Sequence, residues 1–157
     1  MTNFNQVKAS KEPKLFNMSV ELMTSLTNVH KVCSELEIKY AIGGSVGLSL
    51  SGVDLGRELK DLDIILFSKK DLSKFIVHMR ENYNSSHHFK EESNESMIKY
   101  NNSEYYPLHH DDPNPSWASI DVFVDKRTNV TRFCCTTLGQ NFFVAVETYI
   151  IGKKLEI

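Results

Sequence analysis

The sequence has little of what would mark a membrane protein, a secreted protein or a general nucleic-acid binder. It contains only three cysteines, Cys33 and the adjacent Cys134 and Cys135, which make a poor disulfide framework. No apolar run is long enough to span a bilayer, and residues 1–14 lack the apolar core of a signal peptide. The formal net charge is only −2, which argues against a diffuse electrostatic grip on nucleic acid. We therefore expect a cytoplasmic protein with reduced cysteines and no membrane partner.

The length and composition fit a single domain. With 157 residues, 41% of them hydrophobic, the chain can bury a real core but is short for two domains. Residues 1–14 show no periodicity and are closed off by Pro13, so we expect a flexible N-terminal arm followed by one domain over 15–157. Over 17–37 apolar residues recur at spacings of four and three, which predicts an amphipathic helix. These residues are Leu22, Leu26, Val29, Cys33 and Leu36.

The rest of the chain carries short strand patterns and further helices. Ser68 and Asp71 resemble a capping box, which predicts a second long helix ending near Tyr83, and the final residues 147–157 resemble the opening of another helix. Strands are expected at 40–42, 61–67, 97–100, 105–109, 117–124, 130–136 and 142–146.

A Gly-Gly-Ser turn in the stretch 39–66 predicts half of a phosphate site. Gly43 and Gly44 let the backbone approach an anion closely, while the Ser45 hydroxyl and nearby N–H groups can hold phosphate. The alternation of apolar and small residues over 46–51 would also permit a strand. The glycines favour a turn and a short helix, whose positive end would point at the same anion.

Carboxylates supply the other half of the predicted site. Asp61 and Asp63 stand two apart on a strand, so they project from one face and can share a hard cation. Arg57 and Lys60 place two cations just before them and are nucleotide-binding candidates. If Asp121, on the later strand, converges with this pair, divalent metal must offset their repulsion, and two Mg²⁺ ions would suit chemistry on a nucleotide. The alternative interpretation is a capped turn and a solvated strand end.

A second polar cluster is less suited to a site. His109, His110, Asp111 and Asp112 are consecutive, and consecutive side chains of an extended chain point apart. We interpret the cluster as a solvated loop. A transition-metal site that uses His109, His110 and Asp112 is the alternative.

The order of these motifs resembles the nucleotidyltransferase superfamily with a polymerase-beta-type palm. The resemblance rests on Gly-Gly-Ser at 43–45, Arg-Glu-Leu-Lys-Asp-Leu-Asp at 57–63 and Ser-Ile-Asp-Val-Phe-Val at 119–124. The R-x-x-x-D-x-D form with its long gap is similar to the AbiEii-type toxin and lincosamide nucleotidyltransferase branches. It implies an α+β (α/β) fold, in which a mixed sheet of about five strands carries helices packed on one face.

The resemblance also implies roles for the site residues. Gly44 and Ser45 would hold a nucleoside triphosphate. Asp61 and Asp63 would bind both Mg²⁺ ions, and Asp121 would bind the catalytic ion and help activate the acceptor. The implied reaction is transfer of a nucleoside monophosphate to a hydroxyl acceptor, which could be a small molecule, a tRNA or a protein.

Two features of the resemblance concern the end of the chain. In AbiEii-like relatives a helix after the sheet brings a lysine to the phosphates, and Lys153 has a similar spacing. Relatives usually continue into a helical region, whereas this chain ends at Ile157, so a homodimer mate or a protein partner would be needed to complete the enzyme. The alternative function is a catalytically silent binding or regulatory module that acts with a partner protein.

Overall fold

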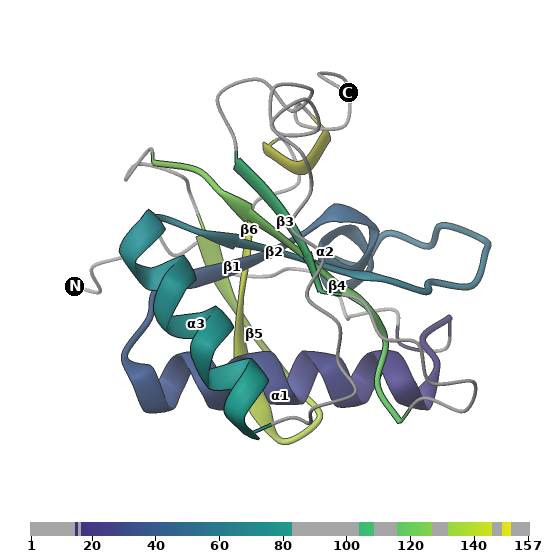
Figure 1. Cartoon of the computed structure of the whole chain (residues 1–157). Coiled ribbons are helices and arrows are strands. Elements are labelled where there is room, and N and C mark those ends of the chain that lie inside the picture. The colour runs from purple at the N-terminus through teal and green to yellow at the C-terminus, as the bar shows by residue number, and fades with distance from the viewer. Residues whose placement is uncertain are drawn as a thin grey trace.

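Six β-strands form one mixed sheet in the computed structural model, which describes residues 15, 17–82, 104–108, 116–126, 132–145 and 149–151 (Figure 1). The strands are β1 Tyr40–Gly43, β2 Leu62–Leu66, β3 Glu104–Leu108, β4 Ile120–Val124, β5 Arg132–Thr137 and β6 Gln140–Ala145. Their order across the sheet is β3-β4-β2-β1-β6-β5. The central strand β2 pairs antiparallel with β1 and parallel with β4, which makes the sheet mixed.

Helix α1, Val20–Leu36, begins and ends where local chemistry dictates. The Ser19 side chain accepts a hydrogen bond from the Leu22 N–H at 3.1 Å, which satisfies one of the donors at the helix start. At the other end Glu37 adopts a left-handed conformation, φ 55°, and its N–H bonds back to the carbonyls of Cys33 and Ser34. The predicted apolar stripe of this helix is buried, apart from the half-buried Leu36.

Two further helices complete the described elements. Helix α2, Gly44–Leu50, follows the Gly-Gly-Ser turn directly, as predicted. Helix α3, Lys69–Asn82, starts at the predicted cap, where the Asp71 N–H donates to Ser68 Oγ at 3.1 Å. None of the described helices is both long and apolar enough to cross a membrane.

The main core lies between the sheet and the two long helices. Figure 1 shows α1 and α3 on the same side of the sheet. Alternate residues of β2 and β4 face them and are almost completely buried: Leu62, Ile64, Leu66, Ile120, Val122 and Val124. Burying each such side chain stabilises the fold by about 1.5–3 kcal/mol, so this face carries most of the stability. The opposite face has a smaller apolar cluster, formed by Ala41, Leu48, Ile65, Ala145 and Ile150.

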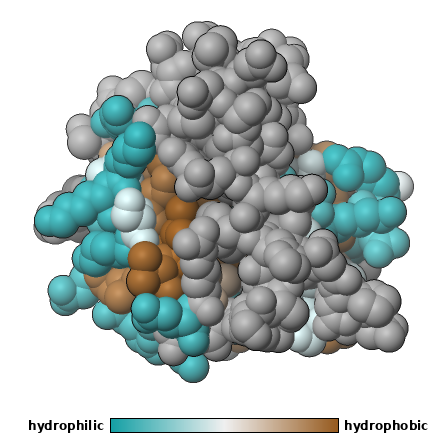
Figure 2. Space-filling view, in the orientation of Figure 1, coloured by the Kyte–Doolittle hydropathy of each residue, from teal (hydrophilic) through white to brown (hydrophobic). Residues whose placement is uncertain are grey.

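The described surface shows few exposed apolar side chains. In the orientation of Figure 1, hydrophilic residues line the left and right of the described surface, and an apolar area lies within the left-hand group (Figure 2). Val20, Val77, Leu138 and Ile151 are the exposed large apolar residues of the described ranges.

The structure confirms the predicted fold class. It is an α+β fold with a mixed sheet and its two long helices on one face, and the sheet has six strands instead of about five. Residues 149–151 are helical, within the helix expected at 147–157. The N-terminal arm at 1–14 and the strand expected at 97–100 lie outside the described residues.

The three cysteines are unpaired, as expected. Cys33 and Cys135 are buried, and Cys134 is half-buried. Burial raises the pKa of the Cys33 thiol, with a further contribution from the negative charge of Asp71, and burial raises the pKa of Cys135 to about 11. Both buried thiols therefore stay protonated and unreactive near neutral pH.

His30 joins α1 to the first strand. Its Nδ1 lies 2.7 Å from the Tyr40 hydroxyl, and its ring meets the Phe142 ring edge-on with centroids 5.3 Å apart. Burial lowers the pKa of His30 and raises the pKa of Tyr40, so this pair is neutral in the folded state. His30 is thus half-buried at the boundary of α1, in contact with Tyr40 and Phe142.

This contact predicts a loss of stability in acid. Because the pKa of His30 is lowered on folding, the unfolded chain takes up a proton first as the pH falls below about 6.5. Its contribution to stability is therefore present at neutral pH and is lost as the pH falls through the folded-state pKa. The free energy of unfolding of the wild type minus that of His30→Gln should decrease between about pH 7.5 and about pH 5, as measured by denaturant titration. A difference that does not change with pH would contradict this account.

Candidate functional site

The register between β1 and β2 places the glycine turn against an acid. Gly43 is the residue opposite Asp63 in this antiparallel pair, so the chain leaves β1 and enters α2 directly beside the Asp63 side chain. Gly44 adopts a left-handed conformation, φ +58°, and a Cβ on it would lie 2.7 Å from Asp63 Cγ and 2.9 Å from Asp63 Cβ. No other residue fits there without displacing the carboxylate.

The parallel pairing of β2 and β4 brings a second acid next to the first. Asp63 and Asp121 are direct partners in this register, and neighbouring strands lie only about 4.8 Å apart. Both side chains project from the face opposite α1 and α3, because their neighbours in the strands, such as Leu62 and Ile120, fill the main core. Asp61 precedes β2 and is exposed.

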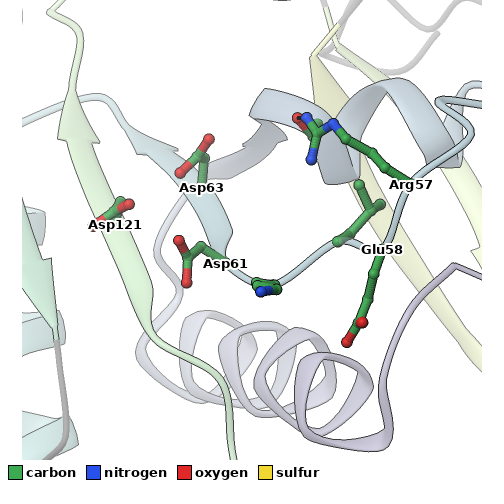
Figure 3. A pocket seen from close by; sticks show the side chains of 8 residues that line it. Arg57, Glu58, Asp61, Asp63 and Asp121 are labelled. Atoms are coloured by element: carbon green, nitrogen blue, oxygen red, sulfur yellow. Dashed lines mark hydrogen bonds between the residues drawn. The ribbon is translucent and has the colours of Figure 1, made fainter.

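These acids share one pocket with the glycine turn and the loop before β2. The pocket has a volume of about 520 Å³. Figure 3 shows Asp61, Asp63 and Asp121 around the same space, with Arg57 and Glu58 on its other side. The residues that line it are Ser45, Arg57, Glu58, Leu59, Lys60, Asp61, Asp63 and Asp121.

Arg57 ties the loop to the turn. Its Nη2 donates a hydrogen bond to Ser45 Oγ at 2.8 Å, across twelve residues of sequence. Lys60 lines the same pocket and is exposed. Two positive side chains therefore line the same pocket as the three aspartates and Glu58, which suits a ligand that carries phosphate and metal together.

The loop that carries Arg57 is anchored by residues that the sequence analysis missed. Asp54 Oδ1 accepts hydrogen bonds from the Gly56 N–H at 2.9 Å and from Asn17 Nδ2 at 3.3 Å. The Leu59 N–H then donates to the Asn17 carbonyl at 3.0 Å. The Asp-Leu-Gly sequence at 54–56 is a signal for a turn closed by an aspartate side chain, and it could have revealed the first of these bonds. The bonds to Asn17 join segments far apart in sequence and carry no local signal.

A second pocket adjoins the first across this loop. It has a volume of about 440 Å³, and its lining includes Asn17, Met18 and Ser19 just before α1. Arg57 and Glu58 line both pockets. The loop is therefore a shared wall, and a substitution of Arg57 changes both spaces.

Comparison with known proteins supports the fold through structure alone. No family model matches the sequence, and no curated protein does either. Three solved structures match with TM-scores of 0.55–0.57. A nucleotidyltransferase-like antigenic protein from Paracoccidioides brasiliensis is 16% identical with a TM-score of 0.57, and the match covers 87% of this chain and 66% of that one.

The other two structures match over most of both chains. A protein from Thermotoga maritima, described as a nucleotidyltransferase, is 14% identical with a TM-score of 0.55, and the match covers 85% of this chain and 84% of that one. The lincosamide antibiotic adenylyltransferase LnuA, bound to lincomycin, is 10% identical with a TM-score of 0.56 and 85% coverage of each chain. The chain has the nucleotidyltransferase fold. The resemblance to this superfamily, seen in the motifs, is thus confirmed at the level of the fold, while the AbiEii-type branch stays a prediction.

Within this nucleotidyltransferase fold most of the candidate residues lie around one pocket. Six of them line the first pocket: Ser45, Arg57, Lys60, Asp61, Asp63 and Asp121. Gly43 and Gly44 do not line it but lie next to Asp63, which does. Lys153 and the cluster His109, His110, Asp111 and Asp112 lie outside the described residues.

The acids of this fold suit the metal that the resemblance implies. Carboxylate oxygens are the ligands that Mg²⁺ prefers, and the three aspartates border one pocket, together with Glu58. Within the described residues, no three His, Cys, Asp or Glu side chains already form a group that could hold an ion. Asp61 is exposed, precedes the strand and lines the same pocket as Asp63 and Asp121. The chemical type of these side chains therefore suits Mg²⁺.

The contact between Gly44 and Asp63 yields a prediction with a matched control. Gly44→Ala should destabilise the fold by about 1–2 kcal/mol through its left-handed backbone, and by at least about 1 kcal/mol more because the Cβ overlaps Asp63. Gly56→Ala carries the same backbone cost at φ +66°, but nothing lies within 4 Å of its Cβ. Thermal and denaturant unfolding should thus show a larger loss for Gly44→Ala. Equal losses would mean that the contact with Asp63 is unimportant.

Proposed function

We propose that this protein transfers a nucleoside monophosphate from a nucleoside triphosphate to a hydroxyl acceptor. The observation that carries the proposal is the meeting of Asp63, Asp121 and the Gly44–Ser45 turn at one pocket. Acids paired across two strands suit a metal-bound phosphate, and a glycine turn suits close approach of that phosphate to the backbone. The fold shared with an adenylyltransferase adds support.

The turn and the loop would bind the triphosphate. Gly43 and Gly44 leave the backbone open to the ligand, and the Ser45 hydroxyl, which accepts a hydrogen bond from Arg57, would donate its own proton to a phosphate oxygen. Arg57 and Lys60 would offset the negative charge of the phosphates. Their charges matter here because α2 has only seven residues, so its dipole contributes little.

The three acids would hold Mg²⁺. Asp61 and Asp63 would ligate two ions, and Asp121 would ligate the ion nearer the acceptor. When bound, the ions supply positive charge that stabilises the phosphates and makes the attacking hydroxyl more acidic. The acceptor oxygen forms a bond to the α-phosphorus, the bond between the α-phosphorus and its bridging oxygen breaks, and pyrophosphate leaves. Asp121 is our candidate to take the acceptor's proton.

A small hydroxylated molecule is the first acceptor class to test. LnuA, with which this chain shares its fold, is a lincosamide adenylyltransferase solved with lincomycin bound. The formal charge of −2 also favours a small acceptor over a large RNA, which would require many cationic contacts. A tRNA end and a protein side chain remain the other two classes to compare.

Replacing the paired acids should remove the activity without unfolding the protein. Asp63→Asn and Asp121→Asn keep the side-chain shape but remove the charge, so transfer from an α-labelled triphosphate should fall at least about a hundredfold. Glu81→Gln, an exposed change on α3 away from the pocket, is the control and should keep full activity. The measurement is labelled product formed with Mg²⁺ and a panel of the three acceptor classes. Product that persists in both aspartate variants would rule out the proposed site.

A further inference from the structure

A short helical segment, residues 149–151, packs on the face of the sheet that carries the acids. Its Ile150 is 2% exposed and belongs to the small apolar cluster with Leu48 and Ile65. Ile65 is two residues after Asp63 on the same strand and therefore shares its face. The segment thus lies against the same layer as the proposed site, opposite the main core.

Ile150 packs directly against α2, the helix that follows the Gly-Gly-Ser turn. A Cβ added to Gly47 would lie 2.7 Å from Ile150 Cδ1 and 2.9 Å from the Ile42 carbonyl oxygen. Gly47 therefore leaves room on one side for the strand backbone and on the other for the Ile150 side chain. It is three residues after Gly44, so Ile150 contacts α2 one turn beyond the site.

Tyr149 contacts the end of β4, the strand that carries Asp121. Its hydroxyl donates to Asp125 Oδ2 at 2.6 Å, and Asp125 is only 3% exposed. The Asp125 N–H in turn donates to the Leu66 carbonyl at 2.9 Å, which fixes the ends of β4 and β2 together. Asp125 stands four residues after Asp121, so Tyr149 acts on the far end of the Asp121 strand.

Helix α2 needs such support because it cannot fix its own position. A helix of seven residues is far below the length at which a helix is stable alone, so packing decides where it lies. Val46 and Leu50 pack into the main core, while Leu48 and its contact with Ile150 hold the opposite side. Because Gly44 already touches Asp63, a shift of about 1 Å in α2 would either open this contact or force the carboxylate away.

We propose that Ile150 and Tyr149 are positioning residues of the nucleotidyl-transfer site. Ile150 holds α2 through Gly47, so that Ser45 faces the phosphates, and Tyr149 holds β4 through Asp125, so that Asp121 stays beside Asp63. Neither residue touches substrate in this proposal. The structural part of the proposal rests on the two contacts, and its consequence for catalysis rests on the proposed function.

The test compares four variants in the full-length chain. Ile150→Ala removes the contact with α2, Ile150→Val keeps most of it, and Tyr149→Phe removes only the hydrogen bond to Asp125. Ile151→Ala is the matched control, since the neighbouring Ile151 side chain is 45% exposed. Three measurements are made: amide hydrogen exchange in α2 relative to α1, the affinity for a non-hydrolysable triphosphate with Mg²⁺, and kcat and KM for transfer from a labelled triphosphate.

Ile150→Ala should raise exchange in α2 about tenfold while α1 changes little, because local opening of a short helix depends on its own packing. It should also weaken triphosphate binding about tenfold. Ile150→Val should restore most of both, Tyr149→Phe should mainly lower kcat with little change in KM for the triphosphate, and Ile151→Ala should match the wild type. Should Ile150→Ala not fold, the smaller truncation Ile150→Val should still raise exchange in α2 more than in α1, and Tyr149→Phe tests the second contact independently.

Two results would overturn the proposal. If Ile150→Ala increases exchange equally in α1 and α2, Ile150 serves global stability only. If it increases exchange in α2 but leaves the triphosphate affinity unchanged, the contact with α2 does not position the site. A wild type that binds no triphosphate would instead refute the proposed function. In that case the exchange measurement still decides whether Ile150 holds α2, and the catalytic role falls with the function.

Discussion

The contact between Gly44 and the Asp63 carboxylate is the constraint on which the site depends. It arises because β1 and β2 pair antiparallel with Gly43 opposite Asp63, so the chain must turn into α2 directly over the acid. Only glycine adopts the left-handed turn and leaves room for the carboxylate. The turn that we propose to bind phosphate and the strand that we propose to carry metal ligands are therefore one packed unit. Neither can move without the other.

One face of the sheet provides the main core, and the opposite face carries the acids of the proposed site. One face packs against α1 and α3 and buries large apolar side chains from every central strand. The opposite face carries Asp63 and Asp121, and its apolar cluster is therefore smaller than the main core. The buried Ile150 and the hydrogen bond from Tyr149 to Asp125 compensate on that face, since they hold the strands and α2 where the main core does not reach.

Features encoded locally in the sequence were predictable, and features set by distant pairing were not. The apolar period over 17–37 and the cap at Ser68 predicted α1 and the start of α3, because each depends on residues within a few positions of one another. The acids and the glycine turn were found because their spacing follows from strand and turn geometry. Strand register, by contrast, joins Asp63 to Asp121 across 57 intervening residues, and only the folded sheet reveals it.

The anchors of the site were missed for the same reason. Asn17 bonds to Asp54, and Ile150 packs on Gly47, but nothing near either residue in the sequence signals its partner. The sheet also has one strand more than the approximate number expected, because short strand patterns do not reveal which of them join one sheet.

The most direct measurement is a crystal structure of the chain with Mg²⁺ and a non-hydrolysable nucleoside triphosphate. The account predicts the α-phosphate beside Asp63 and Asp121, and the remaining phosphates at Ser45 with Arg57 and Lys60 nearby. Arg57 should have exchanged its bond with the Ser45 hydroxyl for a phosphate oxygen. A triphosphate bound in the pocket at Asn17 instead, or phosphates that avoid the Gly44–Ser45 turn, would contradict the central claim.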